Sequence, residues 1–260
     1  MHCRICKSNE LTLFYSIGDN NQFKYYKCEK CGLVNLDLTG LKIAEHQHQY
    51  FKRFKPKADY DKDIRAIQVY RFIKKYVPGK GKYLDIGCGG GNVLYQARKD
   101  GWEVKGIEIS PPFAEYVRER FNIEVDIADF MEYDTTKEKY DLVSVRHVLE
   151  HLPDSLLAMR KIYELLKDDG FAHLEFPNIK SITHRLKRFL SVTGIHKKKY
   201  GPSFLPGHCN EFSKATFVYL LNKTGFQLIR WETYSFKPLM NNIYNRVHIG
   251  GKARTIIKKI

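Results

Sequence analysis

The stretch YLDIGCGGGNVL at residues 83–94 decides the fold. A short apolar strand leads into a turn with the spacing G-x-G-x-G, counted from Gly87, and a helix follows. Glycines allow the backbone to approach a ligand closely, and the N-terminus of the helix adds partial positive charge. The nicotinamide-binding form of this turn requires glycine or alanine where the sequence has Asn92. The spacing, with Asp85 two residues before the first glycine, therefore argues against that form.

Strands and helices alternate through most of the 260 residues. The hydrophobic patterns predict strands over residues 83–86, 104–109, 123–127, 140–145, 171–176 and 226–231. They predict helices over residues 59–76, 92–99, 111–121, 155–166 and 213–224. This alternation predicts an α/β protein with a doubly wound, mostly parallel, Rossmann-like sheet.

Four of the six cysteines form two pairs near the N-terminus, Cys3-x-x-Cys6 and Cys28-x-x-Cys31. Two such hairpins supply the four thiolates that zinc prefers in a tetrahedral site. The first residues lack the apolar segment of a signal peptide, which favours a metal over disulfides. A segment this short cannot bury a sufficient core, so we expect structural zinc to hold a small β module.

The predicted organisation has four parts. They are a zinc-ribbon-like module over residues 1–40, a helical connector over 41–80, a core over 81–235 with a basic insert at 179–207, and a basic tail over 236–260. His46 and His48 lie in the connector, with no nearby cysteine or acidic cluster. We interpret this histidine pair as part of a surface loop.

Two more acids follow the next two predicted strands. Glu108 ends the second strand, where a carboxylate can accept both hydroxyls of a ribose, and Asp129 follows the third, within reach of an adenine amino group. With Asp85 they form a constellation at three consecutive strand ends. Residues 80–232 resemble the class I S-adenosylmethionine (SAM)-dependent methyltransferases in these acids and in LDIGCGGG, YDLVSVRHVLEHLPD and LLKDDGFAHLEFPN.

That resemblance implies SAM as the cofactor and a set of residues that bind it, namely Asp85, Gly87, Gly89, Gly91, Glu108, Ile109, Asp129, Phe130 and His147. Within the class, HVLEHLPD, EFPN and PGHCNEFS are similar to the branch of ubiquinone O-methyltransferases and surface-glycan methyltransferases. The N-terminal module is similar to that of deoxysugar C-methyltransferases, whose large C-terminal domain is not matched here. We therefore expect O-methylation of a sugar, glycan, quinone or lipid-linked small molecule, with a role in polysaccharide biosynthesis.

Methyl transfer from a sulfonium needs in-line positioning and often a base that takes the acceptor proton. The resemblance implies His151, just after the fourth strand, as the candidate base. The alternative is that His151 only packs or forms a hydrogen bond. His208, in the loop before the helix at 213–224, is a second candidate that would face the acceptor.

The net charge of +15 is concentrated in two segments without acids, residues 180–200 and 236–260. In the first, Ile182, Leu186 and Phe189 share one helical face with cations around it, which is the pattern of an interfacial helix. We expect these segments to contact something anionic, either a membrane surface or a diphosphate-linked acceptor. The alternative is an ordinary lid helix packed on the core.

Two other functions compete with this reading of the sequence. An rRNA or tRNA methyltransferase would use the zinc module and the basic surface to bind RNA. The fourth strand ends in RHVLEH, however, and not in the [ND]-P-P-[YF] box of many base-amino methyltransferases. A non-enzymatic scaffold with this fold is disfavoured by the intact glycines and acids. No apolar run is long enough to span a membrane, so we expect a cytoplasmic protein, in some conditions associated with the inner face of the membrane.

Overall fold

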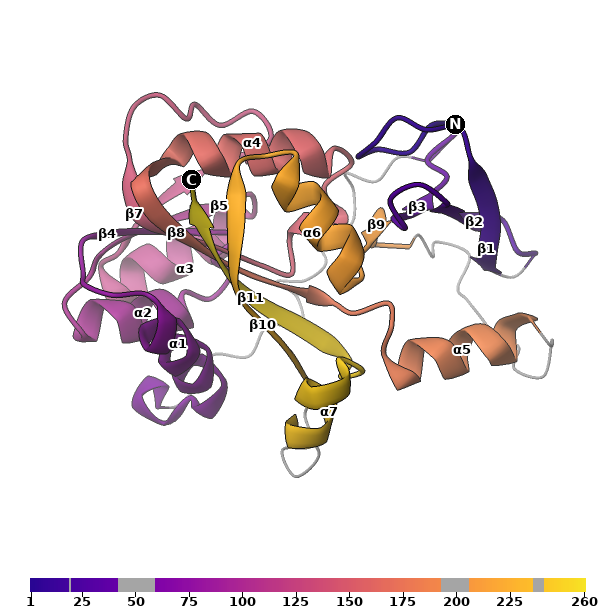
Figure 1. Cartoon of the computed structure of the whole chain (residues 1–260). Coiled ribbons are helices and arrows are strands. Elements are labelled where there is room, and N and C mark those ends of the chain that lie inside the picture. Colours follow the sequence, from indigo (N-terminus) through magenta and orange to yellow (C-terminus); the bar gives the residue numbers. More distant parts are fainter. Residues whose placement is uncertain (19, 42–58, 193–205, 236–240) are drawn as a thin grey trace.

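The computed structural model describes residues 1–18, 20–41, 59–192, 206–235 and 241–260 (Figure 1). His46 and His48 lie outside this part of the chain, as do residues 193–200 and 236–240 of the two basic segments. Within the described part, no helix has the length and apolar character needed to cross a membrane.

A seven-stranded sheet forms the centre of the molecule (Figure 1). Its strands are β4 (Lys82–Ile86), β5 (Glu103–Glu108), β6 (Glu124–Ile127), β7 (Tyr140–Arg146), β8 (Leu166–Pro177), β10 (Phe226–Tyr234) and β11 (Lys252–Lys259). The order is β10-β11-β8-β7-β4-β5-β6, in which β4 to β8 pair in parallel and β11 is antiparallel to both of its neighbours. The prediction of a doubly wound, mostly parallel sheet is confirmed. The order reverses between β4 and β7, which is where ligands bind in such sheets.

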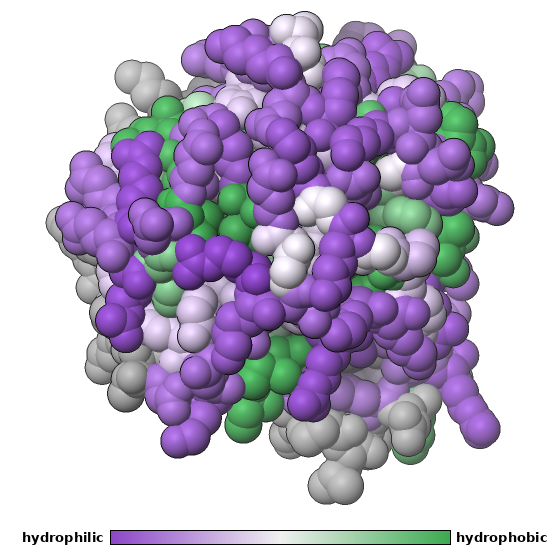
Figure 2. All heavy atoms as spheres, turned by 90° about the vertical axis from the view of Figure 1, so that its left-hand side faces the viewer, coloured by the Kyte–Doolittle hydropathy of each residue, from purple (hydrophilic) through white to green (hydrophobic). Residues whose placement is uncertain are grey.

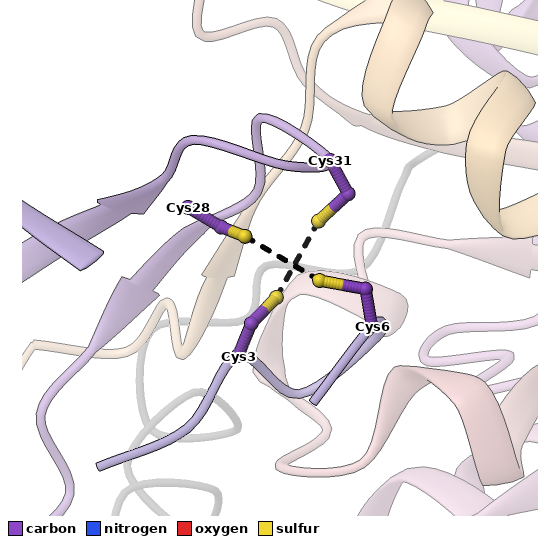
Figure 3. Close-up of side chains that lie close together, drawn as sticks. All are labelled: Cys3, Cys6, Cys28 and Cys31. Carbon is purple, nitrogen blue, oxygen red and sulfur yellow. Dashed lines mark hydrogen bonds between the residues drawn. The ribbon is translucent and has the colours of Figure 1, made fainter. Parts of the chain in front are cut away.

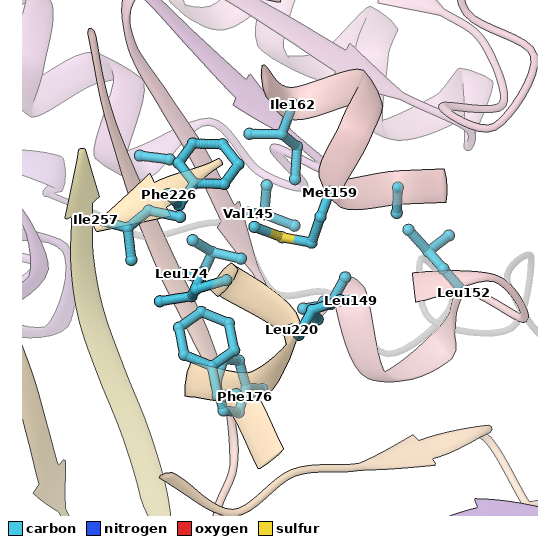
Figure 4. Close-up of a cluster of buried hydrophobic side chains, with 14 of the residues drawn as sticks. Val145, Leu149, Leu152, Met159, Ile162, Leu174, Phe176, Leu220, Phe226 and Ile257 are labelled. Atoms are coloured by element: carbon cyan, nitrogen blue, oxygen red, sulfur yellow. The ribbon is translucent and has the colours of Figure 1, made fainter. Parts of the chain in front are cut away.

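Helices cover both faces of this sheet. The α-helices in the described part of the chain are α1 (Ile64–Tyr76), α2 (Asn92–Lys99), α3 (Pro111–Phe121), α4 (Ser155–Leu165), α5 (Ile182–Val192), α6 (Lys214–Asn222) and α7 (Asn241–Val247). The first three share one buried apolar cluster, whereas α4 and α6 contribute to another. Figure 4 shows this second cluster, with Met159 and Ile162 of α4 and Leu220 of α6 gathered around Leu174 and Phe176 of β8. Burial of these apolar side chains holds α4 and α6 against the sheet and so stabilises the edge of the sheet at which the candidate site lies.

The start of the connector helix differs from its prediction. Residues 60–62 form a separate 3-10 turn, and α1 begins only at Ile64. The Asp63 carboxylate accepts the backbone N–H groups of Arg65 and Ala66, which otherwise have no partner in the first turn of a helix. This cap therefore sets the first residue of α1.

Seen from the side of α1 and α2, the molecule presents a largely hydrophilic surface. Figure 2 shows only small, separate hydrophobic areas on this face. A face of this kind offers no broad apolar patch for a partner.

The basic tail predicted over residues 236–260 is wrong in its last third, because β11 lies inside the sheet between β8 and β10. Ala253, Ile256 and Ile257 of this strand are fully buried. Its cations are paired with acids of neighbouring segments, as in the 2.8 Å contacts Arg254–Glu232 and Lys258–Asp169. The many basic residues of this segment did not indicate a strand, because the acids that neutralise them lie far away in the sequence.

A second, four-stranded sheet has the order β1-β2-β3-β9. Its strands are β1 (Leu11–Ile17), β2 (Phe23–Cys28), β3 (Val34–Leu36) and β9 (Asn210–Glu211). The first three belong to the predicted N-terminal module, but β9 belongs to the core, just after its predicted basic insert, and pairs antiparallel with β3. The module and α5 lie together at one end of the molecule (Figure 1). The module is thus joined to the core through a shared sheet.

Candidate cofactor and acceptor site

The glycine-rich turn lies between β4 and α2, and three of its glycines adopt a left-handed backbone. The φ angles are 68° at Gly87, 53° at Gly89 and 68° at Gly91. A Cβ at Gly87 would lie 2.4 Å from a methyl carbon of Val148, so the turn packs too closely there for any other residue. At Gly89 the same construction meets no atom within 4 Å. The turn is therefore packed against the core on one side and open where a ligand would approach.

Glu108, at the end of β5, holds this turn in place. Its Oε2 accepts the backbone N–H of Gly89 at 2.8 Å, and its Oε1 accepts that of Ser110 at 3.0 Å. Burial raises the pKa of Glu108 above its usual range, while these two N–H groups oppose that shift. Each carboxylate oxygen keeps a second lone pair. The predicted ribose-binding carboxylate is thus preorganised directly beside the open turn, and its remaining acceptor positions fit the hydroxyl groups of a nucleoside cofactor.

Asp85 points into the protein and not toward the open turn. Its carboxylate is fully buried and accepts the hydroxyl of Ser144 and, at 3.1 Å, the guanidinium of Arg146. The structure therefore gives its side chain a supporting position beneath the ligand edge. Burial opposes the charge of Arg146, but the Asp85 and Glu175 carboxylates outweigh it and raise the pKa of this guanidinium.

The remaining predicted cofactor residues surround the ends of β5 and β6. Asp129 is exposed, and its Oδ1 accepts the backbone N–H of Met131 at 2.8 Å. Ile109 is half-buried next to Glu108, whereas Phe130 is buried in the cluster that includes α4. Because β5 and β6 pair at Glu108 and Ile127, the acids Glu108 and Asp129 lie at one edge of the sheet.

His147 occupies the corresponding edge after β7 and has an unusual backbone. Its φ is 56°, and its N–H donates to the Glu175 carbonyl at 2.7 Å. Its Nε2 lies 2.9 Å from the ammonium of Lys252, which can only donate, and its Nδ1 lies 3.2 Å from Glu150. Nδ1 therefore carries the proton that faces the carboxylate. A strained histidine held by two charged partners is a common feature of functional sites.

The two candidate catalytic histidines lie side by side. The rings of His151 and His208 are perpendicular, with centroids 5.0 Å apart. One ligand atom from each, together with the Glu150 carboxylate, lies within 4.8 Å of the other two. Nδ1 of His151 is 2.6 Å from the Gly207 carbonyl. Burial lowers the pKa of His208 to about 4, so this ring is neutral near neutral pH.

Three residues of this cluster were missed by sequence reasoning. Glu150 is almost fully buried, and its Oε2 has no hydrogen-bond partner in the described part of the chain. Burial opposes the ionisation of Glu175, but His173, Arg146 and His147 lower its pKa to about 2. Lys252 lay within the segment that was predicted to be a basic tail. The position of Glu150 directly before the candidate base His151 was a signal for Glu150. The positions of Glu175 and Lys252 depend on the pairing of β8 with β11, which the sequence does not show.

The four paired cysteines come together at the end of the N-terminal module. Figure 3 shows their sulfur atoms converging on one point. The Cys3–Cys31 and Cys6–Cys28 sulfur pairs are each 3.4 Å apart, and all four sulfurs lie within 4.8 Å of one another. A tetrahedral zinc thiolate centre places its sulfurs about 3.8 Å apart, so this donor set fits zinc.

The N-terminal module also forms hydrogen bonds with the loop that carries His208. Arg4, between the first two cysteines, donates to the Cys209 carbonyl at 2.9 Å and to Oδ1 of Asn210 at 3.3 Å. The Tyr25 hydroxyl donates to the His208 carbonyl at 3.1 Å. The hydroxyl of Tyr15 donates to Glu211 at 2.8 Å. The candidate acceptor side is therefore partly built by the N-terminal module.

The sheet order, the glycine turn and the buried carboxylate define a Rossmann-like methyltransferase fold. A sequence profile described as a methyltransferase domain matches residues 48–230, and the chain belongs to this family. It is a SAM-dependent small-molecule methyltransferase. A ubiquinone biosynthesis O-methyltransferase of Actinobacillus pleuropneumoniae is 28% identical over 177 residues, which are 63% of this chain and 73% of the relative. A trans-aconitate 2-methyltransferase of Methylobacterium radiotolerans is 29% identical over 155 residues, 58% of this chain and 59% of the relative.

Solved structures share the fold at lower identity. Magnesium protoporphyrin IX methyltransferase from Synechocystis superposes with a TM-score of 0.59 at 17% identity, covering 86% of this chain and all of that one. The [4+2]-cyclase SpnF superposes with a TM-score of 0.53 at 18% identity, covering 74% and 80%. Because a cyclase shares this architecture, the fold by itself does not define the reaction.

Proposed function

We propose that the protein methylates an oxygen atom of a sugar, glycan, quinone or lipid-linked small molecule, with a role in polysaccharide biosynthesis. The observation that carries this proposal is the cluster of His147, Glu150, His151 and His208 at the edge of the sheet beside the glycine turn. When bound, SAM supplies a methyl group activated by its sulfonium. Glu108 would hold the ribose hydroxyls, and Asp129 would reach the adenine.

His151 is the base in this proposal. A backbone carbonyl only accepts hydrogen bonds, so the contact with Gly207 keeps the proton of a neutral ring on Nδ1 and leaves Nε2 able to take one. Nε2 lies 4.0 Å from the Glu150 carboxylate, which would stabilise the imidazolium that forms. His208 would pack against the acceptor as a neutral ring.

We infer that the four cysteines hold a structural zinc ion. The metal would fix the knuckle that contains Arg4 and, through it, the loop at residues 207–211. It would have no part in the chemical step, because all four thiolates are used as ligands and no coordination position stays open.

The acceptor class is tested by incubating the protein with radiolabelled SAM and either a polar-lipid and nucleotide-sugar extract or total RNA. The proposal expects label in the small-molecule fraction, and label in RNA would contradict it. His151→Ala should lower turnover by about a hundredfold or more, since general-base catalysis typically contributes that much. His2→Ala, at an exposed N-terminal histidine, is the matched control. Near-normal turnover of His151→Ala with intact SAM binding would eliminate the base.

Contact with an anionic membrane through α5 is a further part of the proposal. Ile182 is 50% exposed and Leu186 is 56% exposed, one helical turn apart. This exposure argues against a lid helix packed on the core, although Arg188 contacts the module through Phe14 at 3.1 Å. Co-sedimentation with anionic vesicles tests the contact. Ile182→Asp with Leu186→Asp should abolish it, while Leu157→Asp, at an exposed position on α4, should not.

A further inference from the structure

A cavity of about 250 Å³ lies beside the acceptor edge. It is bordered by the chain after β8, the first turns of α5 and α6, strand β10 and the turn after α7. Its lining residues are Asn178, Lys180, Arg185, Lys214, Trp231, Val247, His248 and Ile249. These come from four separate parts of the chain, and neither the proposed cofactor contacts nor the proposed base uses any of them.

The lining is cationic. Lys180, Arg185 and Lys214 are exposed, and no acidic side chain is among the described residues that line the cavity. Elsewhere in the described chain many lysines and arginines pair with carboxylates, as Arg254 does with Glu232. Three cations around one hollow without a carboxylate repel one another, and an anion placed between them would relieve that repulsion.

Two lining side chains carry buried nitrogen atoms without hydrogen-bond partners. The Lys214 ammonium lies 3.3 Å from Nε2 of His248, and an ammonium only donates, so Nε2 accepts and Nδ1 carries the proton. That Nδ1 is buried and has no acceptor among the residues that the structure describes. Trp231 is 6% exposed, and its Nε1 is also buried without a hydrogen-bond partner among the described residues. Unpaired buried donors are rare and costly, and here two of them belong to one cavity.

The backbone of the cavity is fixed in advance. The side-chain amide of Asn178 donates to the carbonyls of His248 at 2.9 Å and of Gly250 at 3.0 Å. The same segment continues into Lys252, whose ammonium contacts His147 at 2.9 Å. The cavity is therefore tied to the acceptor edge by a few residues of chain.

We propose that this cavity binds the phosphate or diphosphate group of the methyl acceptor. The inference rests on the proposed small-molecule function, and it adds that the acceptor is phosphorylated. The three cations supply charge. The N–H groups of Trp231 and His248, which solvent does not reach in this structure, would donate to phosphate oxygens once a bound anion shifts the side chains that cover them. A diphosphate held here would place the rest of the acceptor toward His147 and His151.

Titration calorimetry of the full-length protein with pyrophosphate tests the cavity directly. We expect saturable binding that weakens by about tenfold or more in Arg185→Ala with Lys214→Ala, because hydrogen bonds to charged groups are worth that much. Trp231→Phe keeps an aromatic ring but removes the N–H, and it should weaken binding less. Lys223→Ala, at the opposite end of α6, is the matched control and should bind as the wild type does.

Competition identifies the source of the phosphate. Displacement of pyrophosphate by uridine diphosphate would indicate a soluble nucleotide-linked acceptor, and displacement by vesicles containing phosphatidic acid would indicate a lipid phosphate. Absence of pyrophosphate binding, or equal weakening by Lys223→Ala, would overturn the proposal. A SAM titration of the same preparations keeps the two failures apart: loss of SAM binding would contradict the cofactor site, whereas loss of pyrophosphate binding alone would contradict only the cavity.

Discussion

The two halves of the sheet are built in different ways. The cofactor half, from β4 to β6, is held by contacts within successive strand and helix units: Glu108 binds the backbone of Gly89, 19 residues earlier, and of Ser110, two residues later. The acceptor half, from β7 to β11, depends on segments far apart in sequence. Arg4 binds the carbonyl of Cys209, which lies 205 residues later. The difference indicates that cofactor binding and acceptor binding can be lost separately.

The largest effect is expected from removing the cysteine cluster. Cys28→Ser with Cys31→Ser should abolish metal binding, which contributes on the order of 10 kcal/mol in isolated zinc modules. Strand β9 would then lose its partner β3, so methyl transfer should be abolished while SAM binding persists. Metal analysis measures the bound zinc, thermal unfolding measures the loss of stability, and a SAM titration measures cofactor binding.

The wild type provides its own control for this experiment. A strong chelator should lower the melting temperature, and added zinc should restore it. If the chelated protein kept both its melting temperature and its transfer activity, the account of the N-terminal module would be wrong.

Arg4→Ala should give a smaller effect of the same kind. Its loss leaves the carbonyls of Leu36 and Cys209 without this donor, at a cost of about 1–3 kcal/mol for each buried group. We expect a lower melting temperature and about tenfold slower transfer, with SAM affinity unchanged. Lys30→Ala, an exposed cation between the second pair of cysteines, is the matched control. A loss of SAM affinity in place of transfer would contradict the separation of the two halves.

The smallest effect concerns pH. Burial lowers the pKa of His208 to about 4 in the folded protein, against about 6.5 in an unfolded chain. As the pH falls from about 6.5 toward 4, the unfolded chain takes up a proton that the folded protein does not, so stability decreases. The loss should be on the order of 1–3 kcal/mol, and His208→Asn should remove it. Denaturant unfolding of both proteins at several pH values provides the measurement, and equal slopes would argue against a buried neutral ring.

The same contrast explains what could be predicted from the sequence. The glycine turn, Glu108 and the alternation of strands and helices are local patterns, and the doubly wound, mostly parallel sheet that they predicted is confirmed, although β11 was not predicted. The paired cysteines were also recognised from spacing alone. The experiments above test whether the individual cofactor and base residues act as predicted.

The acceptor half was harder to predict because its contacts are not local. Strand β11 carries four basic residues and looked like a tail, since the partner acids Asp168, Asp169 and Glu232 come from other strands and turns. Strand β9 is only two residues long, and its pairing with β3 leaves no periodic signal. Asp85 lies at a strand end, yet its side chain turns inward to Arg146, whose position depends on the pairing of β4 with β7.

The most direct test of the central claim is a calorimetric titration of SAM into the wild type, Glu108→Gln and Glu103→Ala. Glu103 is an exposed acid at the other end of β5 and serves as the control. The account predicts that the wild type and Glu103→Ala bind SAM equally. Glu108→Gln should bind about tenfold or more weakly, because it loses charged hydrogen bonds to the ribose. Equal affinity of all three proteins, or no binding by the wild type, would contradict it.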